Sequence, residues 1–229
     1  MKIDILTLFP EMFAPLKTSL IGRAVENNRV EINFIDIRDF TLNKHKKVDD
    51  YPYGGGDGMV LTPQPLYDAI MSVKKENSHV VYLSPKGRVL NQEIVKEFAT
   101  NYEHLVLVCG HYEGIDERII QLCIDEQISL GEFVLTGGEI PAMALTDAIL
   151  RYVPNVLHND HSMVDESFSD GLLEYPQYTH PREFMGLTVP EVLVNGNHKE
   201  IKKWQDEQKI LETKKYRPDL LEKINKSEK

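Results

Sequence analysis

Short apolar stretches alternate with helix-like stretches along residues 1–152 of the chain. The apolar stretches are rich in Val, Ile and Leu, are bounded by turn residues, and predict strands at 2–9, 30–37, 79–84, 104–110 and 126–135. Helical patterns separate them, at 11–28, 63–75, 91–101, 114–123 and 140–152. Pro63 and Pro141 suit a first helical turn, and Asn91 suits an N-cap. This alternation is typical of an α/β fold, a parallel sheet with helices on both faces.

The rest of the chain differs in character. Residues 38–63 form a long connection without clear periodicity, which in a compact domain is usually functional or mobile. Residues 153–184 are polar and rich in Pro, Asn, Asp and Ser, as in a linker. Beyond Glu191 the pattern is helical, with Asn197 as an N-cap and Ile201, Trp204 and Leu211 near one face. We therefore predict an α/β domain over 1–156, a flexible linker over 157–170 and a small all-helical domain over 171–229.

Glycine loops follow three of the predicted strands. They are "SPKG" (84–87), "CGHYEG" (109–114) and "LGEFVLTGGE" (130–139). The turn after the first strand, "LFPEMF", has no glycine, and the chain has no G-x-G-x-x-G and no P-loop, so the usual phosphate-binding signatures are missing. The three loops would all lie at the carboxyl edge of a parallel sheet, which is where open α/β sheets bind ligands.

Charge and cysteine content exclude some classes of protein. A net charge of −10 argues against a non-specific nucleic-acid coat, because phosphate binding needs clustered Lys and Arg. The stretch from Lys199 to Arg217 is a local exception, with seven Lys or Arg against four Asp or Glu. It is either a surface that contacts phosphates or an ordinary solvated helix. Cys109 and Cys123 are expected to be buried, reduced thiols. No apolar run is long enough to cross a membrane, and the start does not resemble a signal peptide, so we expect a soluble cytoplasmic protein.

Other features remain open from composition alone. "YGGGDG" (53–58) is either a flexible loop or a loop that lies close against a ligand. "HNDH" (158–161) lacks the spacing of a transition-metal site, and no metal ligands are predicted. The adjacent carboxylates Asp165 and Glu166 are either a solvated turn or a catalytic pair, and Arg151 is either a partner of a helix dipole or a functional cation.

Taken together, several segments carry a resemblance to one family. "LTLFPEMF", "DDYPYGGGDGMV", "YLSPKGR", "CGHYEGIDERI", "GEFVLTGGEIPAM", "DESFSDGLLEYPQYT" and "GNHKEIKKW" occur in the order and spacing of the bacterial tRNA (guanine-N1)-methyltransferases. The resemblance covers nearly the whole chain, and several of the motifs are long and specific.

The resemblance implies a SPOUT-type fold, in which the C-terminal side of the α/β domain threads a deep trefoil knot. It implies a homodimer with its active site at the subunit interface, which transfers a methyl group from S-adenosylmethionine to tRNA. The target would be N1 of the guanosine at position 37, 3′ of the anticodon, when another guanosine precedes it, and the modification supports reading-frame maintenance. The family's reaction also depends on Mg²⁺, whose ligands the sequence does not indicate.

Carried over residue by residue, the resemblance assigns the methyl-donor site to three segments. The donor is a sulfonium cation without phosphate, so backbone groups and close-approaching glycines suit it better than a lysine-bearing phosphate loop. The predicted donor-binding residues are Tyr82, Leu83, Ser84, Pro85, Gly87, Gly110, Tyr112, Glu113, Gly114, Leu130, Gly131, Glu132, Phe133, Val134, Leu135, Gly137, Gly138 and Pro141.

Catalysis needs a base and a cation, because guanine N1 carries a proton at neutral pH and charge develops toward O6. In the family a carboxylate before "SF" is the base and an Arg at the end of the knot helix is the cation, which match Glu166 and Arg151. This chain has Asp165-Glu166-Ser167-Phe168 where the family usually has Glu-Asp-Ser-Phe. Register favours Glu166 as the base and leaves Asp165 as the alternative.

A second departure concerns RNA recognition. The usual "YTRP" is "YTHP" here, with His180 in place of an Arg that could contact RNA. Two alternatives therefore stay open: a SPOUT-fold enzyme that acts on another RNA, and a non-catalytic RNA-binding module.

Overall fold

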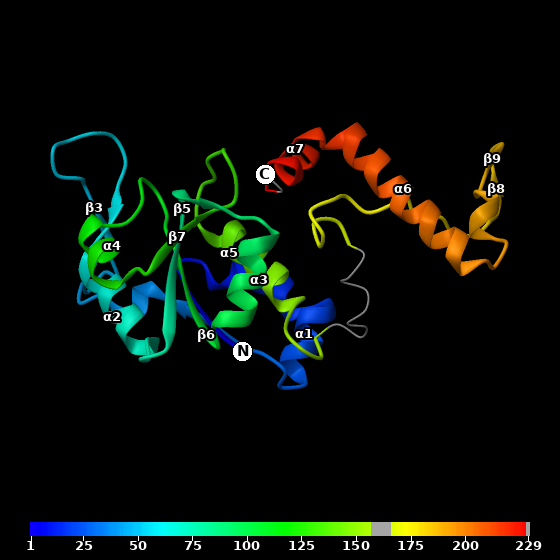
Figure 1. Cartoon of the computed structure of the whole chain (residues 1–229). Coiled ribbons are helices and arrows are strands. Elements are labelled where there is room, and N and C mark those ends of the chain that lie inside the picture. Colours follow the sequence, from blue (N-terminus) through cyan, green and yellow to red (C-terminus); the bar gives the residue numbers. More distant parts are fainter. Residues whose placement is uncertain (157–165, 228–229) are drawn as a thin grey trace. The chain divides into compact units, whose positions relative to one another are not determined.

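The chain separates into two compact units, Met1–His158 and Asn159–Lys229. The computed structural model describes residues 1–156 and 166–227 (Figure 1). Among these residues, no helix combines the length and apolar character needed to span a bilayer.

The first unit contains the predicted alternation of strands and helices. Its central strands are β1 (Lys2–Thr7), β2 (Glu31–Asp36), β5 (Ser78–Val89), β6 (His104–Cys109) and β7 (Glu126–Ser129). A two-stranded hairpin is formed by β3 (Asp49–Asp50) and β4 (Val60–Leu61). The helices are η1 (Pro10–Lys17), α1 (Ser19–Glu26), η2 (Ile37–Phe40), α2 (Pro63–Val73), α3 (Gln92–Asn101), α4 (Glu117–Cys123) and α5 (Glu139–Leu150).

The five central strands form one parallel sheet in the order β2-β1-β6-β5-β7. Alternate residues of each strand face opposite sides, so the sheet contributes to two separate cores. Ile5 and Leu107 belong to the core that contains residues of η1, α1, α3 and α5. Leu6 and Val106 belong to the core that contains residues of η2, α2 and α4. The predicted α/β fold with helices on both faces is thus confirmed.

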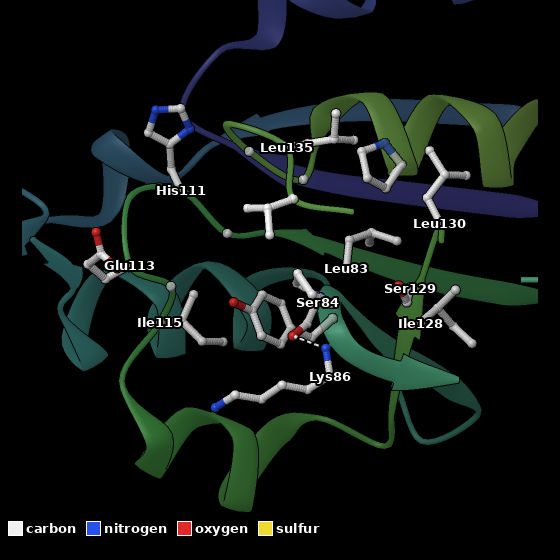
Figure 2. Close-up of a pocket in the computed structure, with 18 of the residues that line it drawn as sticks. Leu83, Ser84, Lys86, His111, Glu113, Ile115, Ile128, Ser129, Leu130 and Leu135 are labelled. Carbon is white, nitrogen blue, oxygen red and sulfur yellow. Dashed lines mark hydrogen bonds between the residues drawn. The ribbon is translucent and has the colours of Figure 1, made fainter. Parts of the chain in front are cut away.

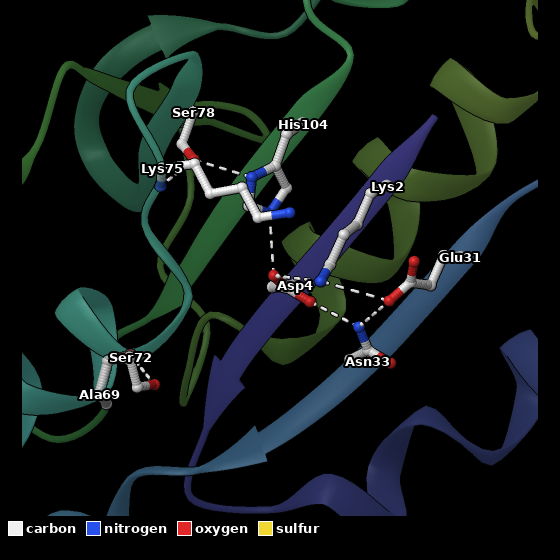
Figure 3. Close-up of polar contacts among 9 residues, drawn as sticks. All are labelled: Lys2, Asp4, Glu31, Asn33, Ala69, Ser72, Lys75, Ser78 and His104. Atoms are coloured by element: carbon white, nitrogen blue, oxygen red, sulfur yellow. Dashed lines mark hydrogen bonds and ion pairs between the residues drawn. The ribbon is translucent and has the colours of Figure 1, made fainter.

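A buried polar network joins β1, β2 and β6 (Figure 3). Asp4, which is fully buried, accepts hydrogen bonds from Asn33 Nδ2 (2.7 Å) and His104 Nε2 (2.8 Å). The Lys75 amide donates to the hydroxyl of Ser78 at 2.7 Å, and the same hydroxyl pairs with His104 Nδ1, also at 2.7 Å. Both ring nitrogens of His104 therefore have a hydrogen-bond partner inside the network.

Asp4→Asn is expected to lower the free energy of unfolding by about 1–3 kcal/mol, because Asn33 and His104 contact different oxygens of Asp4 and an amide keeps only one of them. Urea titration measures the change. Glu31→Gln is the matched control: its carboxylate also accepts from Asn33 (2.9 Å) and lies near Lys2 (3.2 Å), but it is exposed. That variant should stay within about 0.5 kcal/mol of wild type. Equal losses of unfolding free energy in the two variants would contradict the expectation that the buried carboxylate contributes more than the exposed one.

Two predicted boundaries in this unit are wrong. The strand predicted over 126–135 ends at Ser129, where the Ser129 hydroxyl and the backbone of Gly131 exchange hydrogen bonds (2.9 and 3.3 Å) and turn the chain. Residues 130–138 are consequently a loop. The strand predicted over 79–84 instead continues to Val89, past an irregularity in its pairing with β7 between Leu83 and Arg88. The motif at 84–87 is therefore the part of β5 in which the regular pairing with β7 is interrupted.

The second unit is mainly helical. Its elements are the hairpin strands β8 (Glu183–Phe184) and β9 (Leu187–Thr188), the 3-10 helix η4 (Glu191–Leu193), and helices α6 (His198–Tyr216) and α7 (Pro218–Ser227). Asn197 caps α6 as predicted, accepting from the Glu200 amide. The small hairpin adds strand structure to a unit that was expected to be all-helical.

The buried side of α6 also differs from the prediction. Ile201 and Trp204 are half-buried as expected, but Leu211 is exposed. Lys209 and Thr213 are buried in its place. Lys209 is 4% exposed, which removes it from the predicted phosphate-contacting face. Hydropathy alone cannot indicate this arrangement, because a buried lysine depends on a partner elsewhere in the chain.

Candidate functional site

The glycine segments that follow or interrupt β5, β6 and β7 surround one pocket. These three strands are neighbours in the sheet, so their carboxyl ends lie side by side. The pocket has a volume of about 300 Å³ and is lined by residues of 82–86, 110–120 and 128–141. In Figure 2 the side chains surround one space, with Leu135 on one side and Lys86 on the other. The prediction that the three loops meet at the carboxyl edge is confirmed.

Most of the predicted donor-binding residues line this pocket. Those that do are Tyr82, Leu83, Ser84, Pro85, Gly110, Tyr112, Glu113, Gly114, Leu130, Phe133, Val134, Leu135, Gly137, Gly138 and Pro141. Gly87, Gly131 and Glu132 are not among the lining residues. Gly87 instead packs against β7, where an added Cβ would lie 2.3 Å from the Gln127 carbonyl carbon. Gly131 belongs to the turn closed by Ser129, and Glu132 is exposed.

Some lining residues were not predicted. Lys86, His111 and Thr136 lie within the glycine motifs, and Ser129 directly precedes one, so including every position of each motif and its preceding neighbour would have found them. Glu117 and Ile120 come from α4, and Ile115 and Ile128 complete the wall. Finding Glu117 and Ile120 requires knowing that α4 begins next to the pocket.

Close backbone contact holds the last loop against the end of β6. The Gly138 amide donates to the Gly110 carbonyl at 2.8 Å. A Cβ added to Gly138 would lie 2.7 Å from the Cα of Cys109 and 3.1 Å from the Gly110 nitrogen. Glycine is required at this position because the obstacle is backbone, which cannot rotate away.

A buried carboxylate lies at the start of α5. Glu139 is 2% exposed, and its Oε1 accepts a hydrogen bond from the hydroxyl of Thr7, at the end of β1, at 2.8 Å. A carboxylate in the first helical turn interacts favourably with the helix dipole. Burial raises the pKa of the Cys109 thiol well above its usual value, and the negative charge of Glu139 adds to the rise. Cys109 is therefore an inert structural thiol beside the pocket.

The glycine-rich loop at 53–58 reaches the same region. A Cβ at Gly58 would lie 2.5 Å from Oε1 of Glu113, which lines the pocket. The Glu113 amide donates to the Met59 carbonyl at 3.0 Å, and the Leu61 amide donates to the Gly114 carbonyl at 3.0 Å. Gly58 thus approaches a segment that lines the pocket, whereas a Cβ at Gly54, Gly55 or Gly56 would meet nothing within 4 Å. The interpretation that this loop lies close against a ligand stays a prediction.

The electrostatics of the pocket favour a cation over a phosphate. Among the lining residues that the structure describes, Glu113 and Glu117 are acidic and Lys86 is basic. Burial raises the pKa of the Tyr82 phenol, against a smaller opposite effect of a hydrogen bond with the Ile115 backbone, so Tyr82 is neutral at physiological pH. His111 Nδ1 is buried without a hydrogen-bond partner among the described residues. Such an atom can bind a ligand or a water molecule.

Comparison with known proteins shows which family this chain is related to. The family model of the tRNA (Guanine-1)-methyltransferase TrmD matches residues 1–223.

The chain belongs to the tRNA (guanine-1)-methyltransferase family.

Curated relatives match along nearly their full length. A protein of Clostridium perfringens (strain 13 / Type A) is 58% identical over 228 residues, which is 99% of this chain and 96% of the relative. One from Clostridium beijerinckii is 57% identical, covering 98% of this chain and 93% of the relative. One from Staphylococcus aureus (strain JH9) is 53% identical, covering 97% and 91%. Each is named "tRNA (guanine-N(1)-)-methyltransferase".

The predicted catalytic residues of this tRNA (guanine-1)-methyltransferase family member lie in different units. Arg151 is the half-buried C-cap of α5, so one helix connects it to the turn at Gly137 and Gly138. Glu166 is half-buried in the second unit. Asp165, the histidines at 158 and 161 and most of the predicted linker lie outside the described residues. The base and cation assignments therefore stay predictions.

Within residues 1–156 and 166–227, no three His, Cys, Asp or Glu side chains are grouped so as to hold a metal ion.

Proposed function

We propose that the chain transfers a methyl group from S-adenosylmethionine to N1 of the guanosine at position 37 of tRNA, when a guanosine precedes it. The observation that carries this proposal is the pocket at the ends of β5, β6 and β7 in a member of the tRNA (guanine-1)-methyltransferase family. The modification would support maintenance of the reading frame.

The pocket suits the proposed donor in shape and charge. Backbone groups of 84–86, 110–114 and 130–138 can read the edge of an adenine, and Leu83, Leu130 and Leu135 can cover its faces. Glu113 and Glu117 complement a cation. The bound donor supplies an electrophilic methyl group on a positively charged sulfur.

The protein's part in the reaction is proton removal and charge stabilisation. A carboxylate at Glu166 would accept the N1 proton of guanine as the methyl group is transferred. The guanidinium of Arg151 would stabilise the negative charge that develops on O6. Asp165 is the alternative base.

Assembly and location are part of the proposal. Phe133 and Val134 line the pocket and yet are 55% and 83% exposed, which supports a second subunit that covers this side of it. We therefore propose a homodimer with the active site at the subunit interface. From membership of the family we also propose a trefoil knot formed by the pocket loops and a requirement for Mg²⁺. The protein would act in the cytoplasm, where the tRNA substrate is found.

Transfer of labelled methyl groups to tRNA transcripts tests the function. We expect incorporation into a transcript with guanosines at positions 36 and 37, and loss of incorporation when guanosine 36 is replaced. Equal labelling of both transcripts would point to a SPOUT-fold enzyme with another specificity. Binding of the transcript without labelling would point to a non-catalytic RNA-binding module.

A further inference from the structure

Helix α6 carries a stripe of three residues that contacts the segment 166–174. Lys209, Thr213 and Arg217 are spaced four residues apart, at α6 or its C-cap, and so lie on one face. Segment 166–174 begins with the candidate base Glu166 and immediately follows the part of the chain that the structure does not describe.

Each residue of the stripe makes a different contact with the segment. Lys209 Nζ forms an ion pair with Asp170 Oδ2. The Thr213 hydroxyl accepts from the Leu173 amide at 2.9 Å and donates to the Lys209 carbonyl at 2.7 Å. The guanidinium of Arg217 lies 6.0 Å from the centre of the Phe168 ring. Aromatic contacts continue the attachment further along α6, since Tyr175 and Tyr178 both lie against Trp204 (6.5 and 6.3 Å).

Hydrogen bonds within segment 166–174 also fix its conformation. The Phe168 amide donates to the Leu172 carbonyl at 2.6 Å, and the Ser169 amide and hydroxyl both donate to the Glu166 carbonyl, at 3.1 and 2.7 Å. Phe168 has φ +71°, a left-handed conformation that costs a non-glycine residue about 1–3 kcal/mol. Such a conformation persists only where surrounding contacts hold it, and here these are the hydrogen bond to Leu172 and the Arg217 guanidinium at the end of α6.

Burial distinguishes two residues of this stripe from an ordinary helix surface, whereas Arg217 is exposed. Lys209 is 4% exposed and Thr213 is fully buried, although both are polar. A lysine is rarely buried this deeply unless it is paired. The other lysine pairs on α6, Lys202 with Asp206 and Lys203 with Glu207, join residues of the helix to each other and lie at its exposed surface.

We propose that Lys209, with Thr213 and Arg217, is a positioning residue for methyl transfer, which fixes segment 166–174 on α6 and so sets where the carboxylate of Glu166 is presented. This inference rests on the proposed function. The base would then move with α6, the helix that also carries the candidate RNA-contacting lysines, so engagement of tRNA by the second unit would bring the base with it. Helix α6 would thus link the contact with tRNA phosphates to the removal of the guanine proton.

The ion pair is intact at the pH of an activity assay. Partial burial tends to raise the pKa of Asp170, but hydrogen bonds from Lys209 and the Leu172 amide outweigh it and lower the pKa below its ordinary value of 3.8. A carboxylate with a lowered pKa keeps its stabilising charge above that value and loses it only as the pH falls through the folded-state pKa. Assays near neutral pH therefore report on the paired state.

The test is a single-turnover measurement with saturating tRNA transcript and S-adenosylmethionine. Lys209→Met keeps the length of the side chain and removes the charge. We expect its rate constant to fall roughly 10–100-fold while its amplitude, the fraction of active enzyme, stays full, because displacement of a reacting group slows chemistry without inactivating the protein. Lys209→Arg should recover most of the rate. Glu207→Gln, which breaks an exposed ion pair on the same helix, is the matched control and should stay within about twofold of wild type.

A double variant adds a further check. Asp170→Asn should reproduce the loss, and Lys209→Met/Asp170→Asn should be no slower than either single variant, because one contact cannot be lost twice. A full rate constant in Lys209→Met, or a loss confined to amplitude or tRNA affinity, would overturn the positioning role while leaving the proposed function in place. Absence of transfer by the wild-type chain would overturn both.

Discussion

Replacing Glu166 with alanine is expected to lower the single-turnover rate constant of methyl transfer by roughly 10²–10⁴-fold, the range typical of a lost general base. Affinity for S-adenosylmethionine should be unchanged, because Glu166 belongs to the second unit, and among the described residues the pocket is lined by the first unit. Rapid-quench kinetics measures the rate, and calorimetry measures donor affinity.

The neighbouring carboxylate provides the comparison. Asp165→Ala should retain most of the rate, and Glu166→Asp should retain more than Glu166→Ala, since it keeps a carboxylate at the same position in the sequence. The base assignment is wrong if Asp165→Ala loses activity while Glu166→Ala does not.

Gly138→Val is expected to abolish binding of S-adenosylmethionine. Its Cβ would lie 2.7 Å from the Cα of Cys109, so the turn at Gly137 and Gly138 must move away from Gly110 and break the 2.8 Å hydrogen bond between them. All three glycines line the pocket. Calorimetry should detect no heat of binding at donor concentrations that saturate the wild-type protein.

A control variant separates local from general damage in this experiment. Gly22→Ala introduces a similarly close contact, with a Cβ 2.4 Å from the Lys17 carbonyl oxygen, in α1 and outside the pocket lining. It should lower the melting temperature and leave donor affinity intact. Unchanged donor affinity in Gly138→Val would reject the close-approach argument.

The strands and the sheet edge were predictable because their pattern is local. Runs such as "HLVLVC" in β6 are buried along their whole length, and continuous apolar runs are what a sheet covered on both faces requires. The position of the glycine loops followed from strand direction alone. The role of their residues as donor contacts came from the resemblance and stays a prediction until binding is measured.

The features that the sequence analysis missed depend on contacts between distant residues. Nothing local shows that Lys209 is buried, because the reason is Asp170, 39 positions away. The early end of β7 depends on a hydroxyl–backbone turn at Ser129, which the apolar run "FVL" conceals. Glu139 similarly looks like an ordinary helix-start carboxylate until Thr7, 132 positions away, is found to donate to it.

We propose that this chain methylates N1 of guanosine 37 in tRNA. The most direct measurement is nucleoside analysis of a tRNA transcript that has been incubated with the protein and labelled S-adenosylmethionine. We expect one labelled product, 1-methylguanosine at position 37, and no product when guanosine 36 is replaced. Label at another position or on another base, or no label in any transcript, would contradict it.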